Sequence, residues 1–159
     1  MRRRAEFRIA SALPAAPAAV WERAVSAEGI NHELGPLLRM TVPRGAASLD
    51  LRGLEPGPLG RSWLLLFGLL PIDYDEIGLE RIEPGRGFLE RSTMLSQRLW
   101  EHERTLAAAG DGTVIADRLA WEPRLPLPGR ALRPLIAAVF RHRHRRLRRR
   151  FGGVPLPQR

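Results

Sequence analysis

The chain has 159 residues, of which 44% are hydrophobic and 27% charged, and it contains no cysteine. This composition fits one globular domain with a sizeable core, and it excludes a disordered chain, a disulfide framework and thiolate catalysis. Four histidines without cysteine also argue against structural zinc. We therefore expect neither a metal nor a cofactor.

The net charge of +9 is concentrated at the two ends of the chain. Seven arginines lie between Arg141 and Arg150 and three more at positions 2–4, so the intervening chain is nearly neutral. Every basic residue is arginine, a bias typical of GC-rich bacterial genomes, which weakens the functional meaning of any single arginine.

The N-terminal part of the chain predicts a strand, two short helices and two more strands. Phe7 and Ile9 alternate with polar residues as in a strand, and Pro17 fits the first turn of a helix. These elements are Glu6–Ala12, a helix from Pro17 to about Ala27, a helix ending at Leu34, then Leu37–Val42 and Leu49–Leu54.

A five-strand antiparallel meander follows, with breaks at turn-forming residues such as Pro71, Pro84-Gly85 and Gly110-Asp111-Gly112. After a proline-rich linker at Pro123–Gly129, a helix is predicted from Arg133 to Phe151. We expect one domain over residues 1–153 and a frayed tail over 154–159. The predicted strands are Arg61–Leu70, Ile72–Ile82, Gly87–Leu95, Leu99–Leu106 and Val114–Glu122.

Charges occur on both faces of this meander. Because side chains alternate along a strand, an acid followed by an arginine places one charge on the solvent face and one on the covered face. A simple one-sided sheet would have an apolar covered face, so these charges favour a pocket there. The pairs are Glu80-Arg81, Glu90-Arg91, Glu103-Arg104 and Asp117-Arg118.

Charge complementarity suggests a register for the last three strands. Pairing Arg104 with Asp117 brings Trp100 opposite Trp121 and gives the covered face bulky apolar residues. Pairing Glu90 with Arg104 on the other side then predicts two carboxylates that clamp one guanidinium. His102 lies beside this clamp and is a residue type suited to proton transfer near neutral pH.

Two interpretations of these residues remain open. A covered arginine between two acids can be a purely structural ion pair, and His102 can be an ordinary core histidine. In the functional interpretation they orient a ligand, with Asp73 and Tyr74 at the pocket mouth. The predicted ligand-binding residues are Glu90, Ser92, Trp100, His102, Arg104, Asp117, Trp121 and Phe140.

The order of elements over residues 5–152 resembles the START-like (Bet v 1-like, helix-grip) superfamily, especially its bacterial SRPBCC and polyketide cyclase/dehydrase-like branch. The resemblance implies an α+β fold: a curved antiparallel sheet of about six or seven strands around a long C-terminal helix, with two short helices after the first strand. The motifs that carry it are LPAAPAAVW at Leu13–Trp21, Trp100-x-His102, Asp117-Arg118, Trp121-Glu122-Pro123 and FRHRHRRLRRRF at Phe140–Phe151.

Three functions follow as alternatives. Members of this superfamily bind lipids, sterols and polyketides, so the resemblance favours binding of a hydrophobic or aromatic small molecule. An enzyme of the cyclase, dehydratase or hydrolase type would use His102 as general acid/base and Arg104 to stabilise an anion. A basic surface at Arg141–Arg150 could contact anionic lipid or nucleic acid, or simply be a solvated helix face; without interleaved aromatic residues, nucleic acid is the weaker expectation.

The expected location is cytoplasmic. Met1–Arg4 resembles the start of a signal peptide, but Glu6 and Arg8 interrupt the apolar segment that such a peptide needs. The longest apolar run, Trp63–Ile72, is shorter than the roughly 20 residues of a membrane-spanning helix. The sequence leaves a homodimer open.

Overall fold

The computed structural model describes residues 4–126 and 128–158, which form eight strands, three α-helices and one short 3-10 helix. The predictions for positions 1–3, 127 and 159 lie outside the described residues. In chain order the elements are β1 Ala5–Leu13, α1 Pro17–Val25, α2 Ala27–Leu34, β2 Leu38–Met40, β3 Gly57–Leu66, β4 Leu70–Glu83, β5 Gly87–Met94, β6 Gln97–Ala109, β7 Gly112–Pro123, η1 Gly129–Leu132, α3 Arg133–Phe151 and β8 Val154–Pro155.

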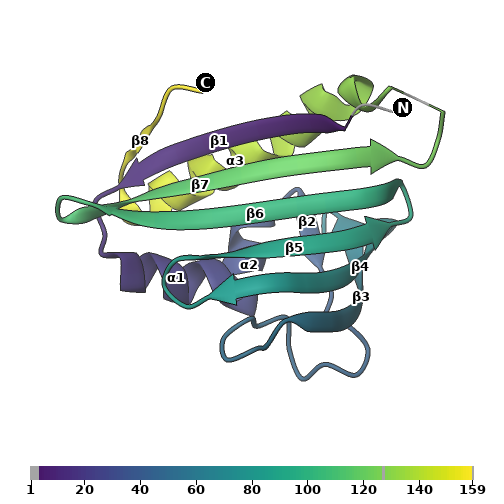
Figure 1. The fold of residues 1–159 in the computed structure, drawn as a ribbon, viewed down its shortest axis with the longest axis horizontal. Coiled ribbons are helices and arrows are strands. Elements are labelled where there is room, and N and C mark those ends of the chain that lie inside the picture. Colours follow the sequence, from purple (N-terminus) through teal and green to yellow (C-terminus); the bar gives the residue numbers. More distant parts are fainter. Residues whose placement is uncertain (1–3, 127, 159) are drawn as a thin grey trace.

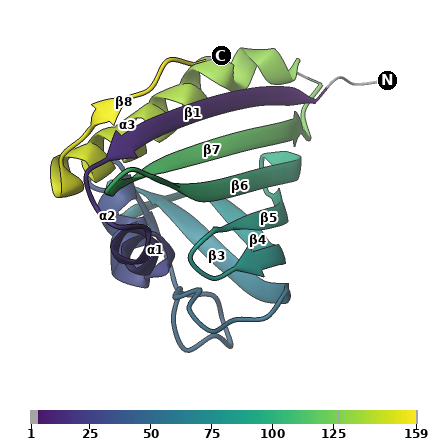
Figure 2. The same cartoon turned by 60° about the vertical axis from the view of Figure 1, so that its left-hand side comes forward.

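One antiparallel sheet holds all eight strands in the order β2-β3-β4-β5-β6-β7-β1-β8. Figure 1 shows α3 running along β1 and β7, and the turned view in Figure 2 shows the sheet curving away from them toward β3. The helices α1 and α2 lie on the concave side of the sheet. The predicted helix-grip architecture is therefore confirmed.

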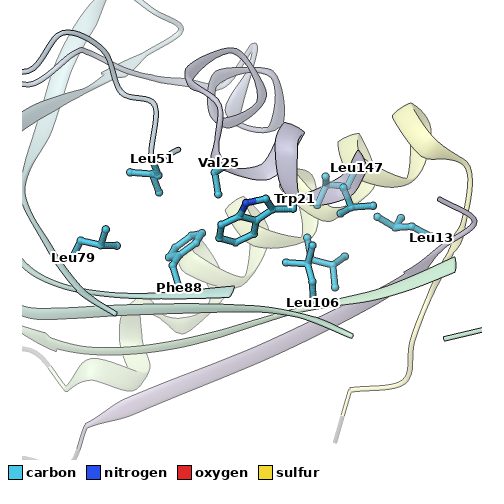
Figure 3. Packing of buried hydrophobic residues seen from close by; sticks show 10 residues of the cluster. Leu13, Trp21, Val25, Leu51, Leu79, Phe88, Leu106 and Leu147 are labelled. Carbon is cyan, nitrogen blue, oxygen red and sulfur yellow. The ribbon is translucent and has the colours of Figure 1, made fainter. Parts of the chain in front are cut away.

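Two apolar clusters attach α3 to the sheet. Near its start, Phe140 packs with Phe7, Leu119 and Trp121. Near its end, Leu147 joins a second cluster that reaches α1, and Figure 3 shows its side chains converging between helices and sheet. This cluster includes Leu13, Trp21, Val25, Leu51, Leu79, Phe88, Leu106 and Ile115.

The helix ends follow from local chemistry. Pro17 occupies the first turn of α1, where its missing N–H leaves no hydrogen bond unmade. Ser26 begins α2, and its hydroxyl accepts a hydrogen bond of 3.0 Å from the backbone N–H of Gly29. The helix α3 stops at Gly152, whose φ of 74° lies in the left-handed region.

The prediction of a strand at Leu49–Leu54 was wrong. This segment has no ladder partner and belongs to the irregular stretch 41–56. Leu49 and Leu51 are buried all the same, while Asp50 between them bonds the side chain of Arg52. The alternation of apolar and polar residues therefore reflects side chains that cover the concave side of the sheet, not a paired strand.

Two other boundaries differ from the predictions. The turn between β3 and β4 lies at residues 67–69, not at Pro71, because Gly68 adopts a φ of 73° there and Leu66 pairs with Leu70. In the predicted frayed tail, Val154 and Pro155 pair with the end of β1 as β8. No helix among the described residues is both long and apolar enough to cross a bilayer.

Candidate functional site

A small cavity lies between the concave face of the sheet, the helices and the irregular stretch 41–56. Its volume is about 50 Å³. Most of its lining is aliphatic or aromatic, with charged and polar groups gathered where β5, β6 and α3 meet. The lining residues are Ala24, Ile30, Met40, Leu49, Leu51, Ile77, Leu79, Phe88, Glu90, His102 and Arg143.

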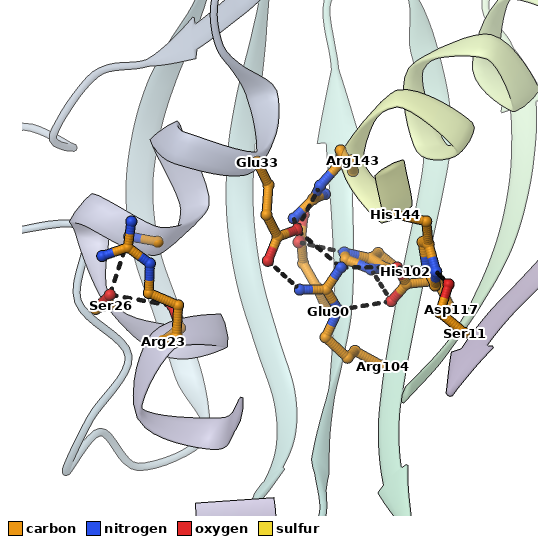
Figure 4. A network of polar contacts seen from close by, with 11 residues as sticks. Ser11, Arg23, Ser26, Glu33, Glu90, His102, Arg104, Asp117, Arg143 and His144 are labelled. Atoms are coloured by element: carbon orange, nitrogen blue, oxygen red, sulfur yellow. Dashed lines mark hydrogen bonds and ion pairs between the residues drawn. The ribbon is translucent and has the colours of Figure 1, made fainter. Parts of the chain in front are cut away.

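Behind the polar end of the cavity, Arg104 lies completely buried between two carboxylates (Figure 4). Its Nε and Nη2 donate to the two oxygens of Asp117, both at 2.7 Å. Its Nη1 and Nη2 donate to Glu33 on α2 at 2.8 and 3.0 Å. Because these bonds occupy most of the guanidinium donors, Arg104 has little capacity left for a ligand.

Two residues of α3 extend this cluster. Arg143 donates from Nε to Glu33 at 3.0 Å, and the buried ring of His144 lies with Nε2 3.0 Å from Asp117. The other ring nitrogen of His144 is 2.8 Å from the hydroxyl of Ser11 on β1. The cluster thus joins the helices α2 and α3 to the strands β6 and β7. We call Glu33, Arg104, Asp117, Arg143 and His144 the ionic cluster.

The charges of the ionic cluster determine how its acids titrate. Burial by itself raises the pKa of Glu33, but Arg104 and Arg143 outweigh it and hold the pKa below the usual 4.5. Burial likewise raises the pKa of Asp117, and Arg104 with His102 brings it well below 3.8. Both acids are therefore ionised at neutral pH.

His102 connects the ionic cluster with the cavity. Its Nε2 lies 2.9 Å from Asp117 and therefore carries the proton, because an ionised carboxylate can only accept. Its Nδ1 is 4.0 Å from Glu90, and its ring meets Phe88 and Phe140 edge to face at centroid distances of 5.3 and 5.1 Å. The Nδ1 of His102 thus faces Glu90 at the cavity wall.

A second acidic group lies beyond His102 and lacks an arginine. The hydroxyl of Ser92 donates to Glu90 at 2.8 Å, and the neighbouring Asp75 is buried with its Oδ1 unpartnered among the described residues. Burial and then the charge of Glu90 raise the pKa of Asp75 well above 3.8. We call Asp75 and Glu90 the acid pair.

The predicted register is confirmed on one side of β6 and wrong on the other. Arg104 pairs with Asp117 and Trp100 with Trp121, as charge complementarity predicts. Between β5 and β6, however, Glu90 pairs with His102 and Phe88 with Arg104, a shift of two residues. A two-residue shift keeps every side chain on its predicted face. The second acid on Arg104 is consequently Glu33 instead of Glu90.

The other predicted site residues are separated by the structure. Trp121 is fully buried and donates from its indole N–H to the carbonyl of Gly129 at 2.9 Å, so it belongs to the core. Trp100 contacts Phe140 beside the same cluster, with ring centroids 6.3 Å apart. Neither tryptophan lines the cavity.

The predicted mouth residues lie elsewhere. Tyr74 pairs with Trp63 on the outer face, opposite to the buried Asp75, and its ring stacks under Arg61. Its placement at the pocket mouth was therefore wrong. Asp73 accepts from the backbone N–H of Tyr74 at 2.8 Å and from Ser96. It thus fixes the turn after β5 and does not line the cavity.

Glu33, Arg143 and His144 were not among the predicted site residues. A helical signal was available for the last two, because Phe140, Arg143, His144 and Leu147 share the spacing of one helix face. Arg143 is buried and therefore does not belong to the exposed helix face predicted at Arg141–Arg150. Among residues 4–126 and 128–158, no three His, Cys, Asp or Glu side chains are grouped to hold a metal ion.

Comparison with known proteins gives the family. The model of a family described as a domain of unknown function, DUF8410, matches residues 11–151. The chain belongs to the DUF8410 family. No protein with curated annotation matches this DUF8410 chain.

Solved structures similar to this DUF8410 domain share its fold at low identity. Protein CV1439 from Chromobacterium violaceum has a TM-score of 0.71 and 14% identity, covering 92% of this chain and 96% of that one. A START superfamily protein from Mycobacterium smegmatis gives 0.66 and 13%, with 93% and 96% covered. Ara h 8.0201 gives 0.60 and 14%, with 91% and 99% covered. The START/Bet v 1-like fold is thereby established for this DUF8410 chain.

Proposed function

We propose that the protein binds a hydrophobic or aromatic small molecule, lipid-like or polyketide-like, in the cavity between the sheet and α3. The observation that carries this proposal is the composition of the cavity wall. Aliphatic and aromatic side chains form most of it, and Glu90 and His102 stand together at one end. An apolar pocket with a few convergent polar groups is the usual form of a small-molecule site.

The polar end favours a ligand that donates hydrogen bonds. Glu90 is an acceptor at the cavity wall, and the Nδ1 of His102 faces it. Arg104, one of the predicted ligand-binding residues, is instead bound to Glu33 and Asp117. A hydroxyl or amino group on an apolar skeleton can donate to Glu90, and the guanidinium of Arg143 supplies a donor in the same lining.

The ligand requires the cavity to open. A volume of about 50 Å³ is far below the roughly 300–1,000 Å³ of pockets for drug-sized ligands. Two lining residues, Leu49 and Leu51, belong to the irregular stretch 41–56, where opening must break the hydrogen bond of 2.8 Å from the Leu51 N–H to the carbonyl of Val25 but leaves the strand ladders intact. Outward movement of this stretch enlarges the cavity while the sheet and α3 keep their places.

Titration with the fluorescent aromatic amine 1-aminoanthracene tests the proposal. We expect saturable binding that weakens about tenfold in Glu90→Gln, because a charge-assisted hydrogen bond is lost. Glu80→Gln on the outer face is the matched control. Leu51→Trp fills the cavity and should abolish binding while the melting temperature is retained. Equal affinity in the wild type, Glu90→Gln and Leu51→Trp would refute a cavity site.

Native mass spectrometry of the protein from its own host supplies an independent test. A stoichiometric adduct that is released on denaturation identifies the ligand class. A protein that carries no adduct and also fails to bind 1-aminoanthracene contradicts the proposal.

A second candidate function is acid–base catalysis on the bound molecule. It is favoured by His102, whose Nε2 is held by Asp117 while its Nδ1 faces the cavity wall beside Glu90. A histidine oriented by a carboxylate is a common general base. If the extracted ligand changes mass on incubation with the protein, His102→Gln should stop that change and still bind the ligand. Turnover at an undiminished rate in His102→Gln would exclude this role.

A further inference from the structure

The hairpin between β3 and β4 exposes a cluster of large apolar side chains. Phe67 is 64% exposed, Leu69 84% and Leu70 60%, and we call these three residues the apolar tip. Trp63 and Ile72 at the base of the hairpin are also exposed, and so are Leu37 and Val42 beside it. Contiguous exposed apolar groups on a water-soluble fold mark interaction sites.

The apolar tip is held out beyond its neighbours. The strand β5 ends at Met94, which pairs with Asp75, so the first residues of β4 pair with β3 alone. The backbone N–H of Phe67 donates to the carbonyl of Leu37 at 2.8 Å, which fixes the turn. Phe67 has a φ of 52°, a conformation that bulky residues rarely adopt. The fold thus maintains an unusual backbone at a position where an aromatic side chain faces water.

The basic group beside the apolar tip is Arg39. Arg61 lies farther along β3 and pairs with Glu76, and Asp73, opposite Leu64, accepts hydrogen bonds from Ser96. Arg39 is exposed, and its side chain runs beside the turn at Gly68. Arg61 stacks 3.9 Å above the ring of Tyr74, which meets Trp63 edge to face. Apolar side chains at the end, with aromatic and basic groups behind them, are the pattern of a membrane interface.

We propose that the β3–β4 hairpin docks on a bilayer surface that contains anionic lipid. The apolar tip enters the boundary between headgroups and acyl chains, Trp63 and Tyr74 lie at headgroup level, and Arg39 meets lipid phosphate. A second copy of the chain fits this surface less well. A two-fold contact would bring the two Arg39 side chains together, while the nearby acids Asp73 and Glu76 are already bound to Ser96 and Arg61.

Flotation with lipid vesicles tests the proposal. We expect the protein to float with vesicles of equal parts phosphatidylcholine and phosphatidylserine, and much less with phosphatidylcholine alone. The double variant Phe67→Ser, Leu69→Ser should reduce binding about tenfold or more, because buried apolar area drives interfacial binding. Both residues are exposed, so folding is preserved. Val154→Ser is the matched control and should bind normally. Val154 is 58% exposed and lies on β8, at the other edge of the sheet from the hairpin.

Three results would overturn the proposal. Unchanged flotation of the tip variant is the first. Equal flotation with neutral and anionic vesicles is the second, since it removes the role of Arg39. The third is a dimer of the wild type, seen by light scattering without vesicle binding, that dissociates in the tip variant. The double variant Arg145→Gln, Arg149→Gln tests the exposed arginines of α3 separately. If this variant no longer floats with vesicles while the tip variant still does, docking belongs to the basic helix. None of these results depends on the cavity ligand.

Discussion

Two groups of acids lie on the concave face of the same sheet, and they differ in how their charge is balanced. In the ionic cluster, Asp117 and Glu33 share Arg104, and Arg143 adds a second guanidinium. In the acid pair, Asp75 and Glu90 face each other without a cation. The burial of charge by itself is therefore a poor marker of a binding site, because complete pairing makes the ionic cluster structural and the missing partner leaves the acid pair available.

The ionic cluster and the acid pair lie on opposite sides of the His102 ring. Toward β7 its ring is fixed by Asp117 and packed between Phe88 and Phe140. Toward β5 it faces Glu90 across 4.0 Å. The ionic cluster therefore holds the histidine in place, and of the acid pair Glu90 lies beside it at the cavity wall.

The largest expected effect comes from breaking the ionic cluster. Arg104→Met should lower the free energy of unfolding by about 3–5 kcal/mol, because two buried carboxylates lose their shared partner. Urea denaturation measures the change. Arg81→Met, in a half-exposed ion pair with Glu103 on the outer face, is the control and should cost less than about 1 kcal/mol. Similar losses in the two variants would show that the ionic cluster is no different from a surface pair.

The acid side of the stability curve gives the next largest effect. Because the folded-state pKa values of Glu33 and Asp117 lie below 4.5 and 3.8, their contribution is present above those values and is lost as the pH falls through the lower folded-state values. Glu33→Gln should therefore lose about 1–3 kcal/mol at pH 7 and show a shallower decline in acid than the wild type. Urea denaturation at a series of pH values measures both. If the stability of Glu33→Gln falls in acid as steeply as that of the wild type, other carboxylates cause the loss of stability.

The acid pair should respond in the opposite direction. Since burial and Glu90 raise the pKa of Asp75, the folded state holds a proton that the unfolded chain releases above pH 3.8, so stability falls as the pH rises through this window. Asp75→Asn removes that penalty and should make the protein more stable at pH 7. The melting temperature measured from pH 4 to pH 8 checks it. A lower melting temperature in Asp75→Asn at pH 7 would mean that the ionised carboxylate is stabilised in the fold.

The smallest effect is expected on the outer face of the same strands. Glu80 and Arg91 form a half-exposed ion pair at 2.7 Å. Glu80→Gln should change the free energy of unfolding by less than about 0.5 kcal/mol, since solvent screens exposed pairs. Urea denaturation in parallel with the Arg104→Met series makes the comparison direct. A loss above 1 kcal/mol would contradict the contrast between the two faces.

Much of the sheet could be predicted from the sequence. The alternation of residues placed Arg104, Asp117 and His102 on the covered face, and opposite charges on facing strands gave the β6–β7 register. The strand faces and this register depend on residues close in sequence. Gly110 supplies the turn between β6 and β7, and the turn then sets which residues of the two strands face each other. The predicted β5–β6 register was wrong because it assigned Glu90 as the second carboxylate on Arg104. In the structure that carboxylate is Glu33 on α2.

Only the tertiary structure decided which groups meet at the site. Glu33 lies 71 positions from Arg104 in sequence, and Arg143 lies 110 positions from Glu33. No local pattern links them, because their contact depends on how α2 and α3 pack over the sheet. The small cavity has the same origin, since Leu49 and Leu51 close it from a stretch without regular structure. Interactions between sequence neighbours thus specify the strands, their faces and one hairpin register, whereas the balance of buried charge depends on the packing of α2 and α3, and the small cavity on the helices together with the stretch 41–56.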